Sequence, residues 1–187
     1  MPCLAIHLAV AKKYLDKHPE ENKDEFILGS IAPDIEIDNL NDYLNGDFTD
    51  KNSRHFGMNF VTDNLIEYMK KKVDFKLFFK KNNLETTFRR AYFLHLLCDY
   101  YFFGEYITDE ELSHYTYEEA VKLGYNDYDL ITPILIKKYN LEVPTQIKDI
   151  VNKKGEGTFS IFNESTVDKF IDEMSNLDLD KEKGKVV

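Results

Sequence analysis

The chain has 187 residues, of which 43% are hydrophobic, and its formal net charge is −10 at pH 7. This length fits one domain with a substantial core. Because basic side chains drive binding to phosphate-rich partners, the acidic balance argues against binding to nucleic acid or to an anionic membrane surface. The short basic runs at 70–72 and 89–90 are expected to be solvated helix ends. We therefore expect no nucleic-acid partner.

The two cysteines, Cys3 and Cys98, are too few for a secreted disulfide framework. The N-terminal residues carry no basic leader ahead of their apolar run and no small-residue cleavage pattern. No apolar stretch approaches the roughly 20 residues that a transmembrane helix needs. These features predict a cytoplasmic protein without stable membrane insertion.

Helical periodicity runs through most of the chain. In order, it predicts helices over residues 4–17, 21–28, 54–69, 73–81, 84–104, 109–114, 117–123, 127–140, 143–152 and 164–174. Residues 155–162 are the one stretch where extended structure is allowed, and the charged residues 177–187 are expected to fray. There is no internal repeat and no alternation of strands with helices. The expected fold class is therefore all-α, with a single helical domain over residues 1–176.

Residues 30–53 predict a long loop, because they are rich in Asp, Asn and Gly. A loop of this length in a compact domain is usually functional or disordered. The preceding helix is expected to end at Gly29. Asp34 is expected to lie at the start of the loop, in a part that is buried against the domain. Ser53 is the expected N-cap of the next helix, which would place His55 in its first turn.

The helix over about 84–104 is expected to be buried at the centre of the domain. Between Ala91 and Phe103 every residue is apolar or aromatic except His95 and Asp99, and a helix that is hydrophobic all round belongs inside a domain. Four positions apart, these two side chains lie on one helix face. A carboxylate without water needs a partner or a metal. For the isolated pair, a His–Asp hydrogen bond and a metal site are equally good explanations.

Five potential metal ligands lie on separate predicted elements or along the central helix: His7, Asp34, His55, His95 and Asp99. Imidazole and carboxylate groups bind zinc and similar divalent ions, and a site needs three or four of them. Taken one at a time, each is more simply a satisfied core or surface residue, so only the set indicates a metal site. His18, beside Pro19 in a charged stretch, is expected at the surface.

The order of these residues resembles the zinc-dependent phospholipase C family, which includes related single-strand nucleases. The matching segments are MPCLAIHLAVA, LGSIAPDI, SRHF and YFLHLLCDYYF, within residues 1–105. Members of that family are all-α and bind up to three zinc ions along a cleft. The resemblance implies that Asp34, His55, His95 and Asp99 hold one metal, and that Asp99 bridges to a second metal held with His7.

The resemblance also suggests a degenerate third site. Family members complete a third metal with a His six residues beyond the bridging Asp and then with a His-x-x-x-Glu pair. The corresponding residues here are Glu105, His114 and Glu118. The secreted members begin with a tryptophan exposed by cleavage, and this sequence contains no tryptophan.

The expected function is metal-dependent hydrolysis of a phosphate ester, with one or two Zn²⁺ ions or other divalent ions as cofactor. A metal activates water and neutralises charge on phosphate oxygens. Asp34 is the candidate general base from its loop position if it is not fully occupied as a metal ligand. The net charge favours a small or zwitterionic substrate over a bilayer or a polynucleotide. Two alternatives remain open: an HD-type phosphohydrolase, although its adjacent His-Asp dipeptide is absent, and a helical domain in which the metal only stabilises the fold.

Overall fold

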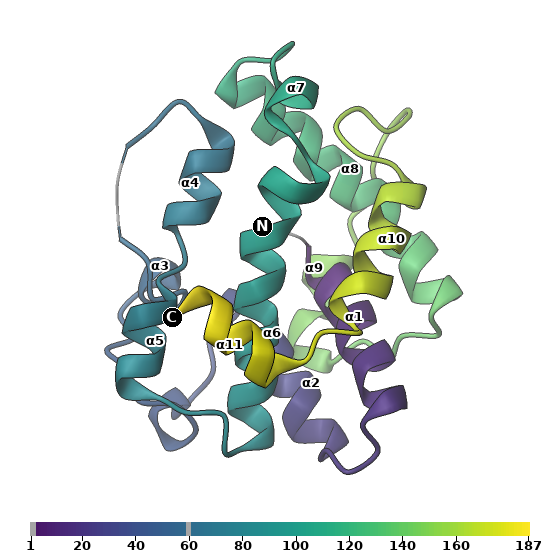
Figure 1. The fold of residues 1–187 in the computed structure, drawn as a ribbon. Coiled ribbons are helices and arrows are strands. Elements are labelled where there is room, and N and C mark those ends of the chain that lie inside the picture. The colour runs from purple at the N-terminus through teal and green to yellow at the C-terminus, as the bar shows by residue number, and fades with distance from the viewer. Residues whose placement is uncertain (1–2, 59–60) are drawn as a thin grey trace.

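The structure, a computed structural model, describes residues 3–58 and 61–187 and is built from helices (Figure 1). No strand occurs in the described residues, which contain only two isolated backbone bridges, Phe56 with Val73 and Phe103 with Ile107. The all-α prediction is confirmed, and residues 155–162 form no strand. None of the described helices combines the length and the apolar character needed to cross a membrane.

The helices are α1 (Leu4–Lys17), α2 (Lys23–Ile31), α3 (Lys51–Arg54), α4 (Leu65–Lys71), α5 (Phe75–Lys81), α6 (Thr87–Tyr101), α7 (Asp109–Leu112), α8 (Tyr117–Lys138), α9 (Lys148–Val151), α10 (Glu164–Met174) and α11 (Leu179–Val186). Single 3₁₀ turns occur at Ala32–Asp34, Leu40–Asp42 and Thr145–Ile147, and a π-helical turn at Phe102–Tyr106 follows α6. The predicted bounds of α1 and α10 agree with the structure.

Helix α6 lies at the centre of the molecule, as its sequence predicts (Figure 1). Every residue from Ala91 to Asp99 is buried. The helix is shorter than expected, because Thr86 caps its N-terminus by accepting a hydrogen bond from the backbone N–H of Arg89, and because Gly104 adopts a φ of 111° that breaks the helical path.

Gly29 lies inside α2 and does not end it, which corrects the sequence-based expectation. A Cβ atom at this position would lie 2.5 Å from the carbonyl oxygen of Phe88 and 2.9 Å from the Cβ of Ala91. The glycine therefore allows the backbones of α2 and α6 to approach closely. A glycine is needed at this position because of tertiary packing, and it does not mark the end of a helix.

The expected helix over 54–69 is also wrong in its boundaries. Asp50 is the N-cap of α3, with Ser53 at the third helical position completing a capping box, so Ser53 is not the cap. His55 follows α3 instead of opening a helix, and Phe56 has a φ of 60°. Helix α4 starts only after Asn64, its N-cap. Residues 59–60, also placed in the expected helix, lie outside the described residues.

Helix α8 is continuous where two helices were expected, and Pro133 lies inside it. Within α8 the fully buried carboxylate of Asp127 accepts hydrogen bonds from the backbone N–H groups of Ser160, Ile161 and Phe162 at 2.6–3.1 Å. These bonds satisfy the backbone N–H groups of residues 160–162 without a sheet.

The C-terminal residues form helix α11, which differs from the frayed tail expected over 177–187. Asp178 caps α11, Leu179 is buried, and the hydroxyl of Tyr101 on α6 donates a hydrogen bond of 2.9 Å to Glu182. The ammonium of Lys183 lies over the Phe79 ring of α5. In Figure 1 this helix lies beside α5 and α6. Burial of one apolar residue and these polar contacts order a segment whose composition alone predicts mobility.

The close packing of α2 on α6 generates a stability prediction. Gly29→Ala should lower the free energy of unfolding by about 1–3 kcal/mol, because the added methyl group forces the two helices apart. Gly184→Ala in α11 is the matched control, since a Cβ there meets nothing within 4 Å, and it should raise stability by about 0.5–1 kcal/mol. Urea unfolding of both variants measures the difference, and equal effects would contradict the packing role of Gly29.

Candidate metal centre

Five side chains from four parts of the chain converge beside α6. His7 comes from α1, Asp34 from the 3₁₀ turn after α2, His55 from the residue after α3, and His95 and Asp99 from α6. All except Asp34 are at most 2% exposed, and the Asp34 side chain is 6% exposed. The structure therefore brings together the complete set that the sequence singled out.

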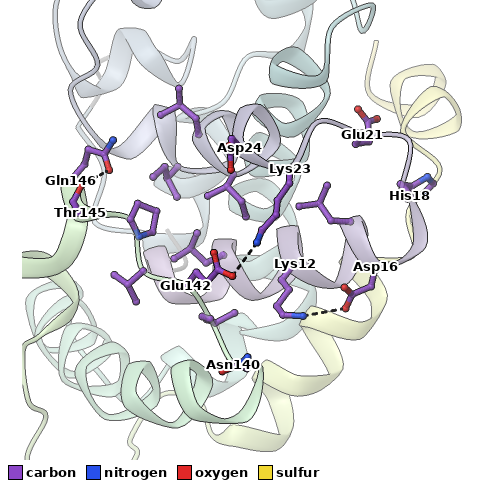
Figure 2. Close-up of a pocket in the computed structure, with 18 of the residues that line it drawn as sticks. Lys12, Asp16, His18, Glu21, Lys23, Asp24, Asn140, Glu142, Thr145 and Gln146 are labelled. Atoms are coloured by element: carbon purple, nitrogen blue, oxygen red, sulfur yellow. Dashed lines mark hydrogen bonds and ion pairs between the residues drawn. The ribbon is translucent and has the colours of Figure 1, made fainter.

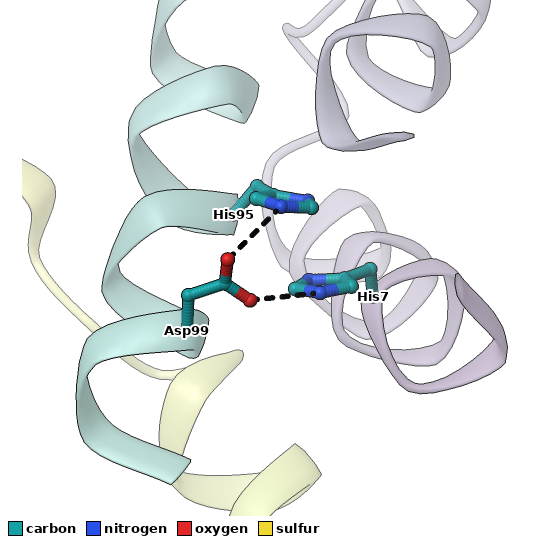
Figure 3. A group of neighbouring side chains, drawn as sticks. All are labelled: His7, His95 and Asp99. Atoms are coloured by element: carbon teal, nitrogen blue, oxygen red, sulfur yellow. Dashed lines mark ion pairs between the residues drawn. The ribbon is translucent and has the colours of Figure 1, made fainter. Parts of the chain in front are cut away.

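Asp99 lies at the middle of this group. Its Oδ1 is 3.3 Å from Nε2 of His7, and its Oδ2 is 3.0 Å from Nε2 of His55 and 3.5 Å from Nε2 of His95. Figure 3 shows His7 on α1 facing His95 and Asp99 on α6. The Asp34 carboxylate lies farther out, with oxygens 3.6–3.9 Å from the same three nitrogens.

Backbone carbonyl groups fix the orientation of two imidazoles. Nδ1 of His55 lies 2.7 Å from the carbonyl oxygen of Lys51, and Nδ1 of His95 lies 2.8 Å from that of Ser30. Because a carbonyl only accepts, each Nδ1 carries the proton, and in the neutral ring Nε2 presents its lone pair to the centre. Metal-binding histidines commonly have this arrangement. His7 is held by stacking on His95, with ring centroids 3.7 Å apart.

A hydrogen bond joins the segment that carries His55 to the segment that carries Asp34. Arg54 donates a hydrogen bond of 3.1 Å from Nε to the carbonyl oxygen of Pro33, and the Tyr92 hydroxyl donates to the Arg54 carbonyl at 2.5 Å. The left-handed backbone of Phe56 is unfavourable for a non-glycine residue, and its buried ring packs edge-on against Tyr92 and Phe78. These contacts hold His55 in the core outside any helix.

The centre contains buried acceptors that face one another. Among the described residues, Nε2 of His7, His55 and His95 and both oxygens of Asp99 have no partner with hydrogen-bond geometry. Leaving such atoms unsatisfied in the core is costly. A cation among them would compensate the carboxylates and use the imidazole lone pairs, so the donor set fits a divalent metal ion.

The electrostatics favour the metal-binding protonation states of His7, His55 and Asp34. They do not favour that of His95: burial lowers its pKa, but the carboxylates of Asp99 and Asp34 outweigh burial and raise it. Burial, together with the neighbouring His95, lowers the pKa of His7 to about 4, and burial also lowers the pKa of His55. Burial opposes ionisation of Asp34, but His95 and Lys51 outweigh it and lower the pKa of Asp34 to about 2. At neutral pH His7 and His55 are thus neutral and Asp34 is ionised, as metal ligands must be.

The ligand atoms form two overlapping groups, each with atoms within 4.8 Å of one another. One group is His7, His95 and Asp99, and the other is Asp34, His55 and His95. Nitrogen and carboxylate oxygen in sets of three or four are the ligands that Zn²⁺ takes. The residues of the suggested third site, Glu105, His114 and Glu118, are all exposed, and no such group forms from them in the described part of the chain.

A pocket of about 550 Å³ opens onto the centre at Asp34. Its lining includes Lys51, Lys72 and an apolar and aromatic wall with Leu65, Tyr68, Phe103 and Tyr117. The ammonium of Lys51 lies 2.8 Å from Oδ1 of Asp34. Lys72 is only 7% exposed, so the expectation that 70–72 is a solvated helix end is wrong for this residue. Neither lysine was predicted from the sequence to belong to the site. The one indication in the sequence was the position of Lys51, four residues before His55.

A second pocket, of about 780 Å³, lies on another side of α1 (Figure 2). It is lined by α1, α2 and residues 140–146, with apolar residues such as Leu8 and Ile27 and with exposed ion pairs, Lys12 with Asp16 and Lys23 with Glu142. None of the five converging side chains lines it. The smaller pocket is therefore the one that gives access to the candidate centre.

The unsatisfied acceptors predict metal binding. Purified protein should contain zinc or a similar divalent ion, and chelation should lower its melting temperature, because a ligand that binds only the folded state adds stability, about 2.7 kcal/mol at a concentration 100 times its Kd. Elemental analysis and thermal melts with added zinc test this. Metal-free protein whose melting temperature does not respond to zinc would contradict the prediction.

Two histidine variants distinguish a metal ligand from a histidine outside the candidate centre. His95→Ala should abolish metal binding and lower the free energy of unfolding by about 3–5 kcal/mol, because it leaves buried Asp99 without one of its partners. His18→Ala is the control, since His18 packs against Tyr14 at the surface, and it should cost about 1 kcal/mol or less. Similar metal content and stability in the two variants would show that the buried cluster is not a metal site.

Comparison with known proteins identifies the family. A family model described as zinc dependent phospholipase C matches residues 3–176, whereas no curated protein and no solved structure matches the chain. The matched range contains all five side chains of the candidate centre and helices α1 to α10. Zinc is consistent with both the family and the buried His/Asp group. The match covers most of the sequence, and the chain belongs to the zinc-dependent phospholipase C family.

Proposed function

We propose that this protein is a zinc-dependent hydrolase that cleaves a small phosphate ester in the pocket at Asp34. The observation that carries the proposal is a buried cluster of acceptors, three imidazoles and two carboxylates, that reaches a pocket of about 550 Å³ through one of its members. A catalytic metal site keeps one side open, whereas a structural site is closed. Family membership supports the same reaction class.

The residues that would hold the metal are His7, Asp34, His55, His95 and Asp99. When bound, zinc supplies a Lewis acid that activates water and neutralises charge on phosphate oxygens. The chain itself contributes orientation: the carbonyl groups of Lys51 and Ser30 direct the imidazoles of His55 and His95. It also excludes water, since four of these side chains are at most 2% exposed.

Asp34 is the proposed general base, through the carboxylate oxygen that does not bind the metal, because it is the member of the cluster that lines the pocket. Its Oδ1 is paired with the ammonium of Lys51 at 2.8 Å, and this pairing helps to keep the pKa of Asp34 low. A carboxylate with so low a pKa is a weak proton acceptor. The basicity of Asp34 would rise when Lys51 moves to a substrate oxygen, so that proton acceptance at Oδ1 becomes coupled to substrate binding.

A purely structural metal site is the second candidate, and the nearly complete burial of the other four side chains favours it. In that case the metal would stabilise the junction of α1, α3 and α6 and take no part in chemistry. The two functions differ in one measurable respect. A structural ion needs no access to solvent, whereas the proposed hydrolase must admit its substrate at Asp34.

Activity assays distinguish the two candidates. Metal-loaded protein should hydrolyse at least one compound in a panel of aryl phosphomonoesters, phosphodiesters and phosphocholine esters, with zinc, manganese or magnesium added. Asp34→Asn should reduce kcat about 100-fold or more, as expected for loss of a general base. Asp16→Asn, on the exposed face of α1, is the matched control and should retain full activity. A folded, metal-loaded protein that turns over none of these compounds would support the structural candidate.

A further inference from the structure

Helix α8 contains a glycine that neither its backbone conformation nor the packing around it requires. Gly124 lies in the interior of α8, where glycine is less favourable than alanine. The glycines with a positive φ are Gly104 and Gly157, so an L-amino acid could adopt the conformation at position 124. Beyond its own stretch of helix, a Cβ atom there would meet no heavy atom of the described residues within 4 Å. Unlike Gly29, this glycine therefore does not allow a close contact between helices.

The space beside Gly124 lies on the side of α8 that forms one wall of the pocket at Asp34. Gly124 lines this pocket together with Tyr117, Val121 and Tyr128. These four positions are spaced i, i+4, i+7 and i+11, so they follow one face of the helix. The glycine thus leaves a gap in a wall that larger side chains form on both sides of it.

Tyrosine rings flank this gap. Tyr117 meets Tyr68 of α4 edge-on, with ring centroids 6.5 Å apart, and this contact joins α4 to α8 beside the pocket. The rings of Tyr125 and Tyr128 also lie nearly perpendicular, with centroids 6.2 Å apart. Tyr125 is 65% exposed and Ile150 of α9 is 50% exposed, and both line the pocket. Large apolar side chains that remain exposed around a cavity are typical of a binding surface.

The pocket is large enough to hold an organic group as well as a phosphate. It measures about 550 Å³, and its lining extends from Asp34 at the candidate metal centre to Gly124 on α8. A flat ring can lie against the helix backbone where no Cβ intervenes. Such a ring also gains from edge and stacking contacts with tyrosines, in addition to the burial of its area, whereas an aliphatic group gains from burial alone. The lining therefore favours an aromatic group.

We propose that the face of α8 around Gly124 is the subsite for an aromatic group, that the substrate is a phosphate ester of an aromatic alcohol, and that Gly124 determines this specificity. The substrate assignment rests on the proposed hydrolase function, in which the phosphate of the ester lies at the metal centre. Stability and specificity are opposed at this position, because an alanine would stabilise α8 and narrow the subsite.

The test uses calorimetric titration of the full chain loaded with stoichiometric zinc. The probes are methylphosphonate, phenylphosphonate and cyclohexylphosphonate, which present the same headgroup and have no ester bond to hydrolyse. Phenylphosphonate should bind about tenfold more tightly than methylphosphonate, because its ring is buried in the subsite. It should also bind severalfold more tightly than cyclohexylphosphonate, which is similar in size but not flat.

Variants at the gap should change the binding of the ring and leave the binding of the headgroup intact. Gly124→Leu should weaken phenylphosphonate binding about tenfold and change methylphosphonate affinity by less than about twofold, because leucine fills the gap without reaching the metal centre. Gly124→Ala should weaken phenylphosphonate binding severalfold and raise the urea midpoint of unfolding. If Gly124→Leu does not fold, Gly124→Ala carries the test. Zinc content should be the same in both variants as in the wild type.

Gly184 in α11 provides the matched control. A Cβ atom at Gly184 also meets nothing within 4 Å, and this residue does not line the pocket. Gly184→Ala should therefore raise the urea midpoint and leave the affinity for all three phosphonates unchanged. Equal effects of Gly124→Ala and Gly184→Ala on phenylphosphonate binding would contradict the role of Gly124.

Failure of this inference differs from failure of the hydrolase proposal. Equal binding of phenylphosphonate and cyclohexylphosphonate, or wild-type affinity for phenylphosphonate in the Gly124 variants, would overturn the aromatic subsite, even in a protein that hydrolyses phosphate esters. Zinc-loaded protein that does not bind phenylphosphonate would overturn it as well. The expected binding pattern in a protein that hydrolyses no ester would uphold the subsite and contradict the hydrolase function.

Discussion

The fold depends on the need to compensate one buried carboxylate. Asp99 is fully buried in the central helix, and three imidazole nitrogens lie 3.0–3.5 Å from its oxygens. They come from α1, from the end of α3 and from α6, so these segments must converge on Asp99 for the core to close. A charge in a medium of low polarity needs a compensating partner, and a cation held between the Asp99 oxygens and these imidazole nitrogens would be that partner. The geometry of the site and the packing of the core are therefore set by the same contacts.

The approach of α2 to α6 links the backbone to this site. Gly29 lets the two helices come close enough that a side chain at this position would collide with Phe88. The next residue, Ser30, then presents its carbonyl oxygen to Nδ1 of His95 at 2.8 Å. The orientation of a candidate metal ligand on one helix is thus determined by the absence of a side chain on another. Gly29 therefore affects the geometry of the candidate metal centre as well as the packing of the two helices.

Net charge is a poor guide to the chemistry of the pocket. The chain carries −10 overall, yet the lining of the pocket includes Lys51, whose ammonium lies 2.8 Å from Oδ1 of Asp34, and the buried Lys72. Global charge governs long-range attraction and solubility, whereas a ligand in a pocket responds to the few groups beside it. An acidic chain and a pocket lined by lysines are compatible because the two charge distributions act over different distances.

The sequence by itself determined the all-α class and the burial of the central helix with His95 and Asp99, because these follow from periodicity and from polar residues in an apolar run. Helices α1 and α10 were predictable for the same reason. The other three members of the cluster were singled out as potential ligands near apolar residues, and the resemblance to the phospholipase C family joined the five into one set. Only the tertiary structure decided that Gly29 lies within a helix, that α8 is continuous and that 179–186 is ordered, since each depends on contacts with distant residues. The same holds for Lys72: local sequence marks it as part of a charged helix end, and only the packing of the chain around it makes it a buried lysine in the lining of the pocket at Asp34.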